Sequence, residues 1–147
     1  MGVLYAAMAY YLKPKAVVVT AQGALVIPKA RDGHFYAQGT VNGQSVRFMV
    51  DTGASLVFVS APLARAAGLG AGVSTVFKTA NGDLFGQIVT GVPVTLGPVA
   101  VSSVRVGVGL VGENDADALL GQSFLAQFEV LIANDKLVLR PKTLSIQ

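Results

Sequence analysis

The sequence has no cysteine, no tryptophan and a single histidine, His34, among its 147 residues. The absence of cysteine excludes disulfides, thiol catalysis and thiolate metal sites. One histidine cannot build a histidine-rich zinc site, and His34 follows the turn residues Asp32 and Gly33, where a structural role is expected. Any acid–base chemistry must therefore come mainly from carboxylates.

Charged residues are also scarce, at 13% of the chain against about 25% in typical domains, whereas 52% of the residues are hydrophobic. The 11 Lys and Arg exceed the 8 Asp and Glu, but they are scattered and not interleaved with aromatic residues, so nucleic-acid binding is not expected. The length fits one domain with a hydrophobic core. The apolar surplus predicts that a partner or a membrane covers part of the surface.

The N-terminal stretch "GVLYAAMAYYL" has 11 uncharged residues, fewer than the ~20 that span a bilayer. It also lacks the basic start and cleavage site of a signal peptide. We expect residues 1–30 to form an apolar segment, either the remnant of an anchor, an interfacial element or interface strands, and residues 31–147 to form the main domain. Membrane association through this segment and a periplasmic location are both consistent with it.

Most of the remaining chain consists of short β-branched and aromatic runs separated by turn signals. Asn-Gly at 42–43 and 81–82, Gly-Pro at 97–98 and Asn-Asp at 134–135 predict four hairpins. Proline or glycine marks two short helices, in "APLARAAGLG" and "QSFLAQF". The pattern predicts an all-β domain, a barrel or sandwich with one or two short helices.

One carboxylate, Asp51, interrupts the apolar run "RFMVDTGASLVFVS". Burying an ionised carboxylate without partners is costly, so this acid requires an explanation. Because Thr52 and Gly53 follow, we expect Asp51 at a turn that ends a buried strand, with Gly53 permitting positive φ or close approach of another chain. Such a carboxylate could bind a cation, carry a phosphoryl group or form half of a carboxylate pair.

The first two roles lack supporting residues. A cation site needs several oxygen ligands, and the nearest acid on the N-terminal side is Asp32. An aspartyl-phosphate site of the haloacid dehalogenase type needs a second Asp where Gly53 stands, and the acidic stretch "ENDADA" at 113–118 has the composition of a solvated loop. A two-fold axis in a homodimer would supply the missing partner, because Asp51 then meets its own copy. Two such carboxylates share one proton and can activate a water.

The motifs "FMVDTGAS", "TANG" and "DALLGQSFLAQFEVLIANDKLVL" follow one another in this order. In these motifs the chain resembles the retropepsin-like aspartic proteases of clan AA, in particular the single-domain bacterial members, from about Gly33 to Arg140. The resemblance implies a closed β-barrel with one lobe per chain, a homodimer, a peptide or protein substrate, and no metal or cofactor. The reaction would be endopeptidase cleavage without a covalent intermediate.

The resemblance also assigns roles to individual residues. Asp51 would be the catalytic acid contributed by each subunit, with Thr52 bonding across the dimer axis. The residues expected to support the catalytic loop are Thr52, Gly53, Ala54, Leu119, Leu120 and Gly121. The flap tip that closes over an extended substrate would be Ala80, Asn81 and Gly82. Candidate pocket walls, each of which also suits the core, are Val50, Leu84, Phe85 and Ile88.

The sequence differs from pepsin-type enzymes in two respects, and each difference leads to a prediction. The flap has no tyrosine, so backbone groups or Asn81 must bond the substrate. Ala54 replaces a hydroxyl residue that would favour the ionised carboxylate, so we expect an activity optimum nearer neutral than pepsin's. Ser55 and Ser123 are expected to be turn and helix-cap residues.

The terminal runs "AVVVT" and "KLVLRPKTLSI" are the expected dimer interface. The alternative function is a non-catalytic dimerisation or peptide-binding module on the same fold, against which the intact Asp51-Thr52-Gly53 argues. A membrane-tethered structural protein is a third reading that rests on the N-terminal stretch alone.

Overall fold

The computed structural model describes residues 18–19, 23–109 and 117–142. Strands dominate these residues, as the sequence predicts. The strands are β1 (Val18–Val19), β2 (Leu25–Pro28), β3 (Tyr36–Val41), β4 (Gln44–Val50), β5 (Val57–Val59), β6 (Val73–Thr79), β7 (Gly82–Leu96), β8 (Val99–Val108), β9 (Ala118–Leu120), β10 (Phe128–Ala133) and β11 (Lys136–Pro141). The helices of the described part are α2 (Ala61–Ala66) and α3 (Gln122–Leu125).

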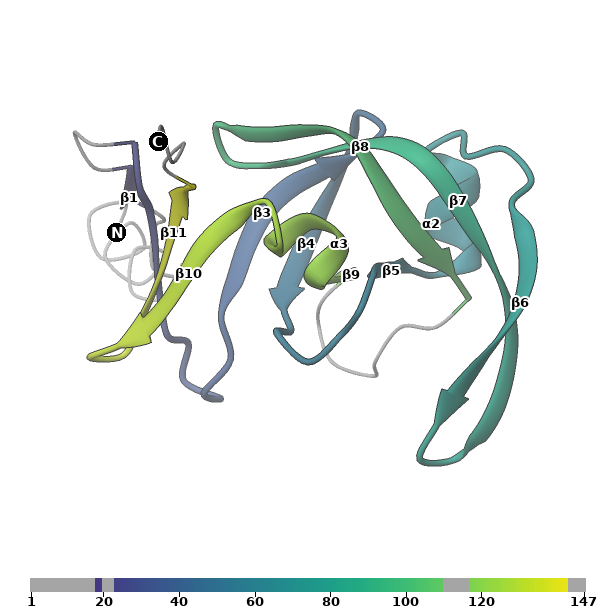
Figure 1. Cartoon of the computed structure of the whole chain (residues 1–147), viewed down its shortest axis with the longest axis horizontal. Helices are drawn as coiled ribbons and strands as arrows, with labels where there is room; N and C mark the ends of the chain where they lie inside the picture. The colour runs from purple at the N-terminus through teal and green to yellow at the C-terminus, as the bar shows by residue number, and fades with distance from the viewer. Residues whose placement is uncertain (1–17, 20–22, 110–116, 143–147) are drawn as a thin grey trace, which may run out of the picture.

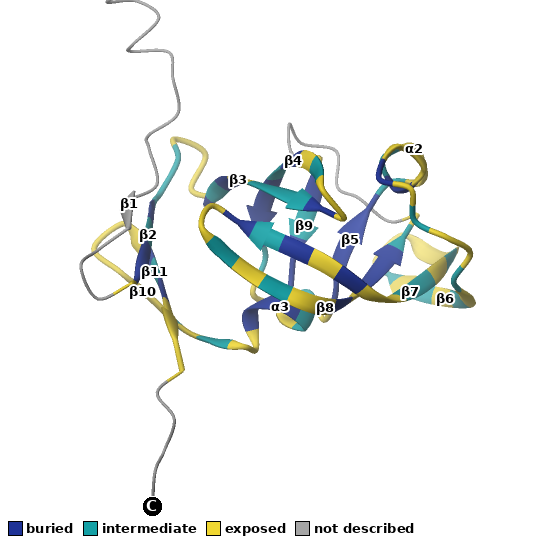
Figure 2. Cartoon of the chain, turned by 90° about the horizontal axis from the view of Figure 1, so that it is seen from above, coloured by how far each residue is buried: buried dark blue, intermediate teal, exposed yellow. Residues whose placement is uncertain are grey.

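Six of these strands close into a barrel, which confirms the predicted fold class. The hydrogen-bonded order is β3-β4-β9-β5-β8-β7-β6, and β3 also pairs with β7, so the ring closes and β6 stays outside it. The β6–β7 hairpin therefore projects from the barrel, at the lower right of Figure 1. Figure 2 shows the buried positions concentrated in the barrel strands, while this hairpin is mostly half-buried or exposed.

A four-stranded sheet, in the order β1-β2-β11-β10, lies at the other end of the molecule (Figure 1). Leu25 and Ile27 of β2 and Leu137 and Leu139 of β11 are buried in the same core as the barrel residues. Strand β2 therefore packs with the domain, whereas residues 1–17 lie outside the described part of the chain. Strand β11 pairs with β10 along its whole length and with β2 from Lys136 to Leu139.

Three of the predicted hairpin turns form at the expected residues. Asn42 and Gly43 have φ of 49° and 84°, and Asn134 and Asp135 have φ of 54° and 61°. Positive φ at both central residues is the signature of the type I′ turn, whose twist matches that of the flanking strands. The β7–β8 hairpin turns at residues 97–98, between the paired Leu96 and Val99.

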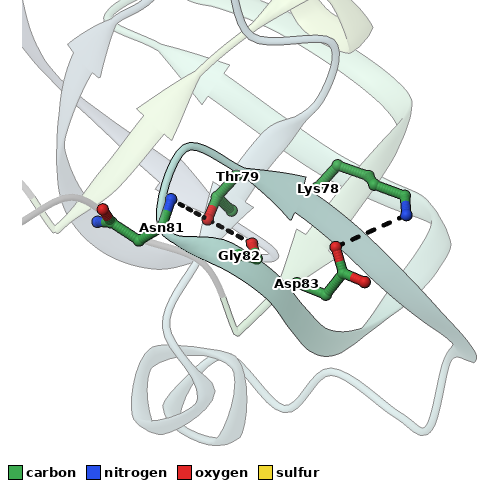
Figure 3. Close-up of polar contacts among 5 residues, drawn as sticks. All are labelled: Lys78, Thr79, Asn81, Gly82 and Asp83. Atoms are coloured by element: carbon green, nitrogen blue, oxygen red, sulfur yellow. Dashed lines mark hydrogen bonds and ion pairs between the residues drawn. The ribbon is translucent and has the colours of Figure 1, made fainter.

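The fourth turn is shifted by one residue from the prediction. Thr79 pairs with Gly82, so the loop consists of Ala80 and Asn81, and Gly82 rather than Asn81 takes positive φ, at 112°. The Thr79 hydroxyl explains the shift, because it accepts from the amide of Asn81 at 3.2 Å and donates to the carbonyl of Gly82 at 2.6 Å. Both bonds are drawn in Figure 3.

Helix α2 forms in the predicted run, with Pro62 in the first turn and Gly68 ending the helix with φ of 69°. The structure adds an N-cap that the sequence analysis did not identify: Ser60 accepts a hydrogen bond from the amide of Leu63. Helix α3 differs, because its N-cap is Gly121. The prediction of Ser123 as a cap is therefore wrong: its hydroxyl instead accepts from the amide of Val57 and donates to a β8 carbonyl. Within the described residues, no helix is long and apolar enough to cross a membrane.

Candidate active site

Asp51 lies one residue beyond the end of β4, at the turn where the sequence places it. Its amide donates to the carbonyl of Leu120 at 3.0 Å, which extends the parallel pairing of β4 with β9. One carboxylate oxygen, Oδ1, accepts from the amide of Gly53 at 3.0 Å. The side chain is half-buried, and Thr52 and Gly53 are exposed. The expectation of a buried acid is thus not met within one chain, because the loop opens to solvent.

The loop after Asp51 is fastened to the start of α3. The amide of Ala54 donates to the carbonyl of Asp51 at 3.1 Å, and the carbonyl of Ala54 accepts from the amide of Gln122 at 2.8 Å. The side-chain amide of Gln122 donates to the carbonyl of Thr52 at 2.9 Å. Sequence analysis did not identify Gln122, because this contact joins residues 70 positions apart. Two hydrogen bonds from Gln122 therefore hold the loop backbone from the side of α3, and a third closes the loop on itself.

Gly121 and Gly53 both lie in this region, but they differ in whether the surrounding structure requires a glycine. A Cβ on Gly121 would lie 2.1 Å from the carbonyl oxygen of Leu56 and 2.7 Å from that of Ala54, so only glycine fits. Gly53 does not take the positive φ that we expected, and among the described residues its Cβ would meet only the Asp51 carboxylate, at 3.4 Å. Within the described residues, neither backbone conformation nor packing demands glycine at position 53.

A row of side chains crosses the barrel on the face opposite its core. The strand registers pair Met49 with Leu119, Leu119 with Phe58, Phe58 with Gly107 and Gly107 with Ile88. Partners in adjacent strands point to the same face of a sheet. Met49 and Phe58 are only 8% and 6% exposed, yet neither belongs to the core cluster. This row forms an apolar wall.

Asp51 shares that face. Side chains alternate along a strand, and Val50 points into the core, so Met49 and Asp51 project to the opposite side. The apolar wall therefore begins directly beside the carboxylate. Met49 and Phe58 escaped sequence analysis because an apolar side chain in a strand does not reveal which face is the interior.

The four candidate pocket walls separate into different environments. Val50 is a core residue and does not line a pocket. Ile88 belongs to the apolar wall, while Leu84, on the β6–β7 hairpin, is 42% exposed. Phe85 is 84% exposed and borders a cavity of about 380 Å³ between α2 and β7, which Arg65 also lines.

The tip of the β6–β7 hairpin carries the residues predicted to form a flap, Ala80, Asn81 and Gly82, all of them exposed. The hairpin is stabilised locally by the Thr79 hydroxyl bonds, and Lys78 and Asp83 lie 3.7 Å apart across it (Figure 3). The ion pair is exposed and therefore contributes little.

A groove of about 520 Å³ runs from the loop that follows Asp51 to β10. Thr52 and Gln122 line one end of it, and Phe128, Val130 and Ile132 of β10 line the other. Ile132 is 52% exposed and lies on a strand whose outer edge is unpaired in the described residues. The groove thus runs from the loop that carries Asp51 to the apolar edge of the four-stranded sheet.

A polar cluster lies at the start of β3. Asp32 accepts hydrogen bonds from the Tyr36 hydroxyl and from the amide of His34, which fixes His34 in a turn, and the Arg47 guanidinium lies 4.0 Å from the centre of the Tyr36 ring. The Tyr36 bond, followed by that from His34, lowers the pKa of Asp32 below its ordinary value of 3.8. The Asp117 carboxylate accepts a hydrogen bond from the backbone amide of Arg47. We assign this cluster a structural role.

The described residues contain no group of three or more His, Asp and Glu side chains that could hold a metal ion. Of the acidic stretch at 113–118, residues 113–116 lie outside the described residues.

Residues 37–127 match the family described as "gag-polyprotein putative aspartyl protease". Over 80% of this chain and 89% of the other, the structure is similar to the crystal structure of a retropepsin-like aspartic protease from Rickettsia conorii, with a TM-score of 0.67 and 34% sequence identity. The matched segment includes Asp51 and extends through α3.

Two curated relatives are similar in sequence. An uncharacterized protein in the cobV 5′ region of Sinorhizobium sp. is 33% identical in an alignment of 134 residues that covers 86% of this chain and 57% of that protein. Uncharacterized protein RP867 of Rickettsia prowazekii is 32% identical in an alignment of 120 residues that covers 75% of this chain and 48% of that protein. The chain thus spans about half the length of the curated relatives it matches.

The chain belongs to the retropepsin-like aspartic protease family. The fold, the position of Asp51 at the end of β4 and the family match agree with one another.

Proposed function

We propose that this protein is an aspartic endopeptidase whose active site contains Asp51 from each of two subunits. The observation that carries the proposal is the placement of Asp51: a half-buried carboxylate at a strand end, on a loop whose backbone is braced by Leu120 and Gln122. A binding module would not need a carboxylate held in this way beside an apolar wall.

The chemistry follows from bringing two Asp51 carboxylates within about 3 Å of each other, where both cannot be ionised. The pair then shares one proton and titrates as a unit. The ionised carboxylate takes a proton from a water, which attacks the peptide carbonyl carbon, while the protonated one donates to the carbonyl oxygen. Proton transfer to the leaving nitrogen completes cleavage, and no covalent enzyme intermediate forms.

Three features support a two-fold arrangement. Thr52 and Gly53 are exposed, and nothing in the described chain demands glycine at position 53. The groove beside Thr52 leads to the apolar edge of β10, where Ile132 is 52% exposed. A second copy seated there would cover both and bring the loops together.

This arrangement changes the expected interface. Since both edges of β11 are paired from Lys136 to Leu139, we propose that β10, rather than the run "KLVLRPKTLSI", supplies the intersubunit edge. Residues 143–147 of that run lie outside the described part.

We propose that the substrate is an extended peptide with apolar side chains. It would lie between the β6–β7 hairpin and the wall formed by Met49, Leu119 and Phe58. Main-chain hydrogen bonds to the hairpin would hold the peptide, as in other recognition by strand addition, with Ala80, Asn81 and Gly82 at the flap tip.

The test is digestion of a diverse library of unstructured peptides from pH 3 to 8 by the wild type and by Asp51→Asn. The substitution preserves the shape of the side chain and removes the acid–base pair. We expect the wild type to cleave peptides and the variant to cleave them at least about 10³-fold more slowly. A loss of this size is in the range expected when a general acid–base group is removed. Asp135→Asn, in the exposed ion pair with Lys29 at the β10–β11 turn, is the matched control and should retain activity.

Equal activity in wild type and Asp51→Asn would overturn the catalytic assignment. No cleavage by a wild type that is folded and dimeric would favour the non-catalytic peptide-binding module.

A further inference from the structure

The β6–β7 hairpin extends beyond its support in the sheet. Strand β7 pairs with β8 only from Gln87 onward, and β6 pairs only with β7. Among the described residues, the stretch from Thr75 to Gly86 is therefore a two-stranded ribbon without a third strand, and an isolated hairpin of this kind is marginally stable in water. Side-chain contacts must therefore fix its position relative to the barrel.

One aromatic contact joins this ribbon to the barrel. Phe77 of β6 meets Phe58 of β5 edge to face, with ring centroids 5.3 Å apart and planes at 84°. This is a favourable geometry for an aromatic pair. Phe77 is paired with Leu84, three residues beyond the last pairing of β7 with β8, so the contact reaches into the unsupported ribbon. Phe58 lies in the apolar wall that begins beside Asp51.

Two glycines make room for the rings. A Cβ on Gly107 would lie 2.6 Å from two carbons of the Phe58 ring and 3.1 Å from the Phe77 ring. A Cβ on Gly86 would lie 2.6 Å from the Phe77 ring. Neither glycine takes positive φ. At Gly107 the two rings exclude a side chain, whereas at Gly86 the carbonyl oxygen of Val108, 2.4 Å from the added Cβ, excludes it together with the Phe77 ring. The contact between the two rings thus involves four residues from four strands: Phe58, Phe77, Gly86 and Gly107.

We propose that Phe77 is a positioning residue of the active site, whose ring contact with Phe58 holds the base of the β6–β7 hairpin at a fixed height above the apolar wall. This inference rests on the proposed function for its link to peptide cleavage. The part of the hairpin that moves over a bound peptide is then confined to residues 78–84. The contact raises the fraction of molecules with the hairpin in the binding-competent position, and that fraction scales the apparent affinity for substrate.

The test compares Phe77→Ala with the wild type by amide hydrogen exchange and peptide-cleavage kinetics. We expect exchange in residues 75–86 to accelerate about tenfold or more, with β3 and β4 unchanged, the local opening expected when an aromatic pair and its buried area are lost. We expect KM to rise about tenfold and kcat to change less than about threefold, because the competent fraction falls while the carboxylates stay in place.

Val76→Ala is the matched control, since Val76 neighbours Phe77 on the opposite face of β6 and is 42% exposed. It should leave exchange and KM within about twofold of wild type. Gly107→Ala approaches the same contact from β8 by displacing the Phe58 ring. It should reproduce the Phe77→Ala effect, and the double variant should add nothing further.

Unchanged exchange in residues 75–86, an equal acceleration throughout the barrel, or an equal effect of Val76→Ala would each overturn the proposal. The exchange measurement does not require cleavage, so it tests the ring contact even if the wild type cleaves no peptide. In that case the proposed function fails while the role of Phe77 in holding the hairpin is judged separately.

Discussion

The side-chain amide of Gln122 donates a hydrogen bond of 2.9 Å to the carbonyl oxygen of Thr52. This bond links the first residue of α3 to the loop that carries the carboxylate. Gln122 also lines the groove that we propose a second subunit fills. A residue at this junction affects the position of the catalytic loop without touching the reacting atoms.

Replacing Gln122 by alanine should lower kcat/KM about fivefold, because one hydrogen bond of about 1 kcal/mol no longer orients the loop. Gln127→Ala is the control, since Gln127 is exposed and no side-chain hydrogen bond of it is observed. Steady-state kinetics on one peptide distinguishes the two. Equal activity of the two variants would show that the Thr52 contact does not matter for catalysis.

Replacing Gly121 by alanine should destabilise the protein by about 3 kcal/mol, the upper range for overpacking, because the new methyl group would meet two backbone carbonyls that cannot move independently. Gly70→Ala is a matched control, since its Cβ would meet nothing within 4 Å and its φ is not positive. Urea denaturation measures both. A Gly121→Ala variant as stable as Gly70→Ala would contradict the packing described for the loop.

Replacing Ile132 by aspartate should weaken the proposed dimer at least about tenfold, because the interface would bury an unpaired carboxylate. Activity per chain should then become strongly dependent on concentration. Val73→Asp is the control, because Val73 is 73% exposed on the β6–β7 hairpin, away from the groove. Sedimentation analysis gives the association constant of each. A dimer unaffected by Ile132→Asp would place the interface elsewhere.

Asp32 should make stability depend on pH. Its pKa is lowered in the folded chain, first by the Tyr36 hydroxyl and then by the amide of His34, so folding favours the ionised form. The contribution is present above the ordinary value of 3.8 and is lost as the pH falls through the folded pKa. Thermal melts should show Asp32→Asn less stable than wild type at pH 7, with the difference narrowing below pH 3.8.

Tyr36→Phe removes the largest cause of that shift and should shrink the same pH-dependent difference. A gap between wild type and Asp32→Asn that is equal at pH 7 and pH 3 would contradict the assignment.

Ala54 should place the activity optimum nearer neutral than in pepsin-type enzymes, which carry a hydroxyl there. Ala54→Ser should move the maximum of the pH–rate profile toward acid, because a hydroxyl donor favours the ionised carboxylate. Ser55→Ala, at the exposed next position, should leave the profile unchanged. A wild-type maximum at or below pH 3 would contradict this prediction.

The local features were predictable from sequence because they depend on neighbouring residues. Asn42-Gly43 adopts the two positive φ values of a type I′ turn, and Pro62 occupies the first turn of α2 as the sequence predicts. Where the prediction failed, a local side chain competed: the Thr79 hydroxyl set the turn of the β6–β7 hairpin one residue earlier than Asn81-Gly82 suggested.

The sequence by itself determined the class of the protein: the absence of cysteine, the single histidine and the order of the motifs around Asp51 and Leu120 point to carboxylate chemistry on a β-barrel. The tertiary structure alone decided which residues hold the site. Gln122 reaches Thr52 and Phe77 reaches Phe58 only because barrel closure brings strands and α3 together. Such contacts depend on register across long sequence separations, and a one-residue slip would turn each side chain to the other face.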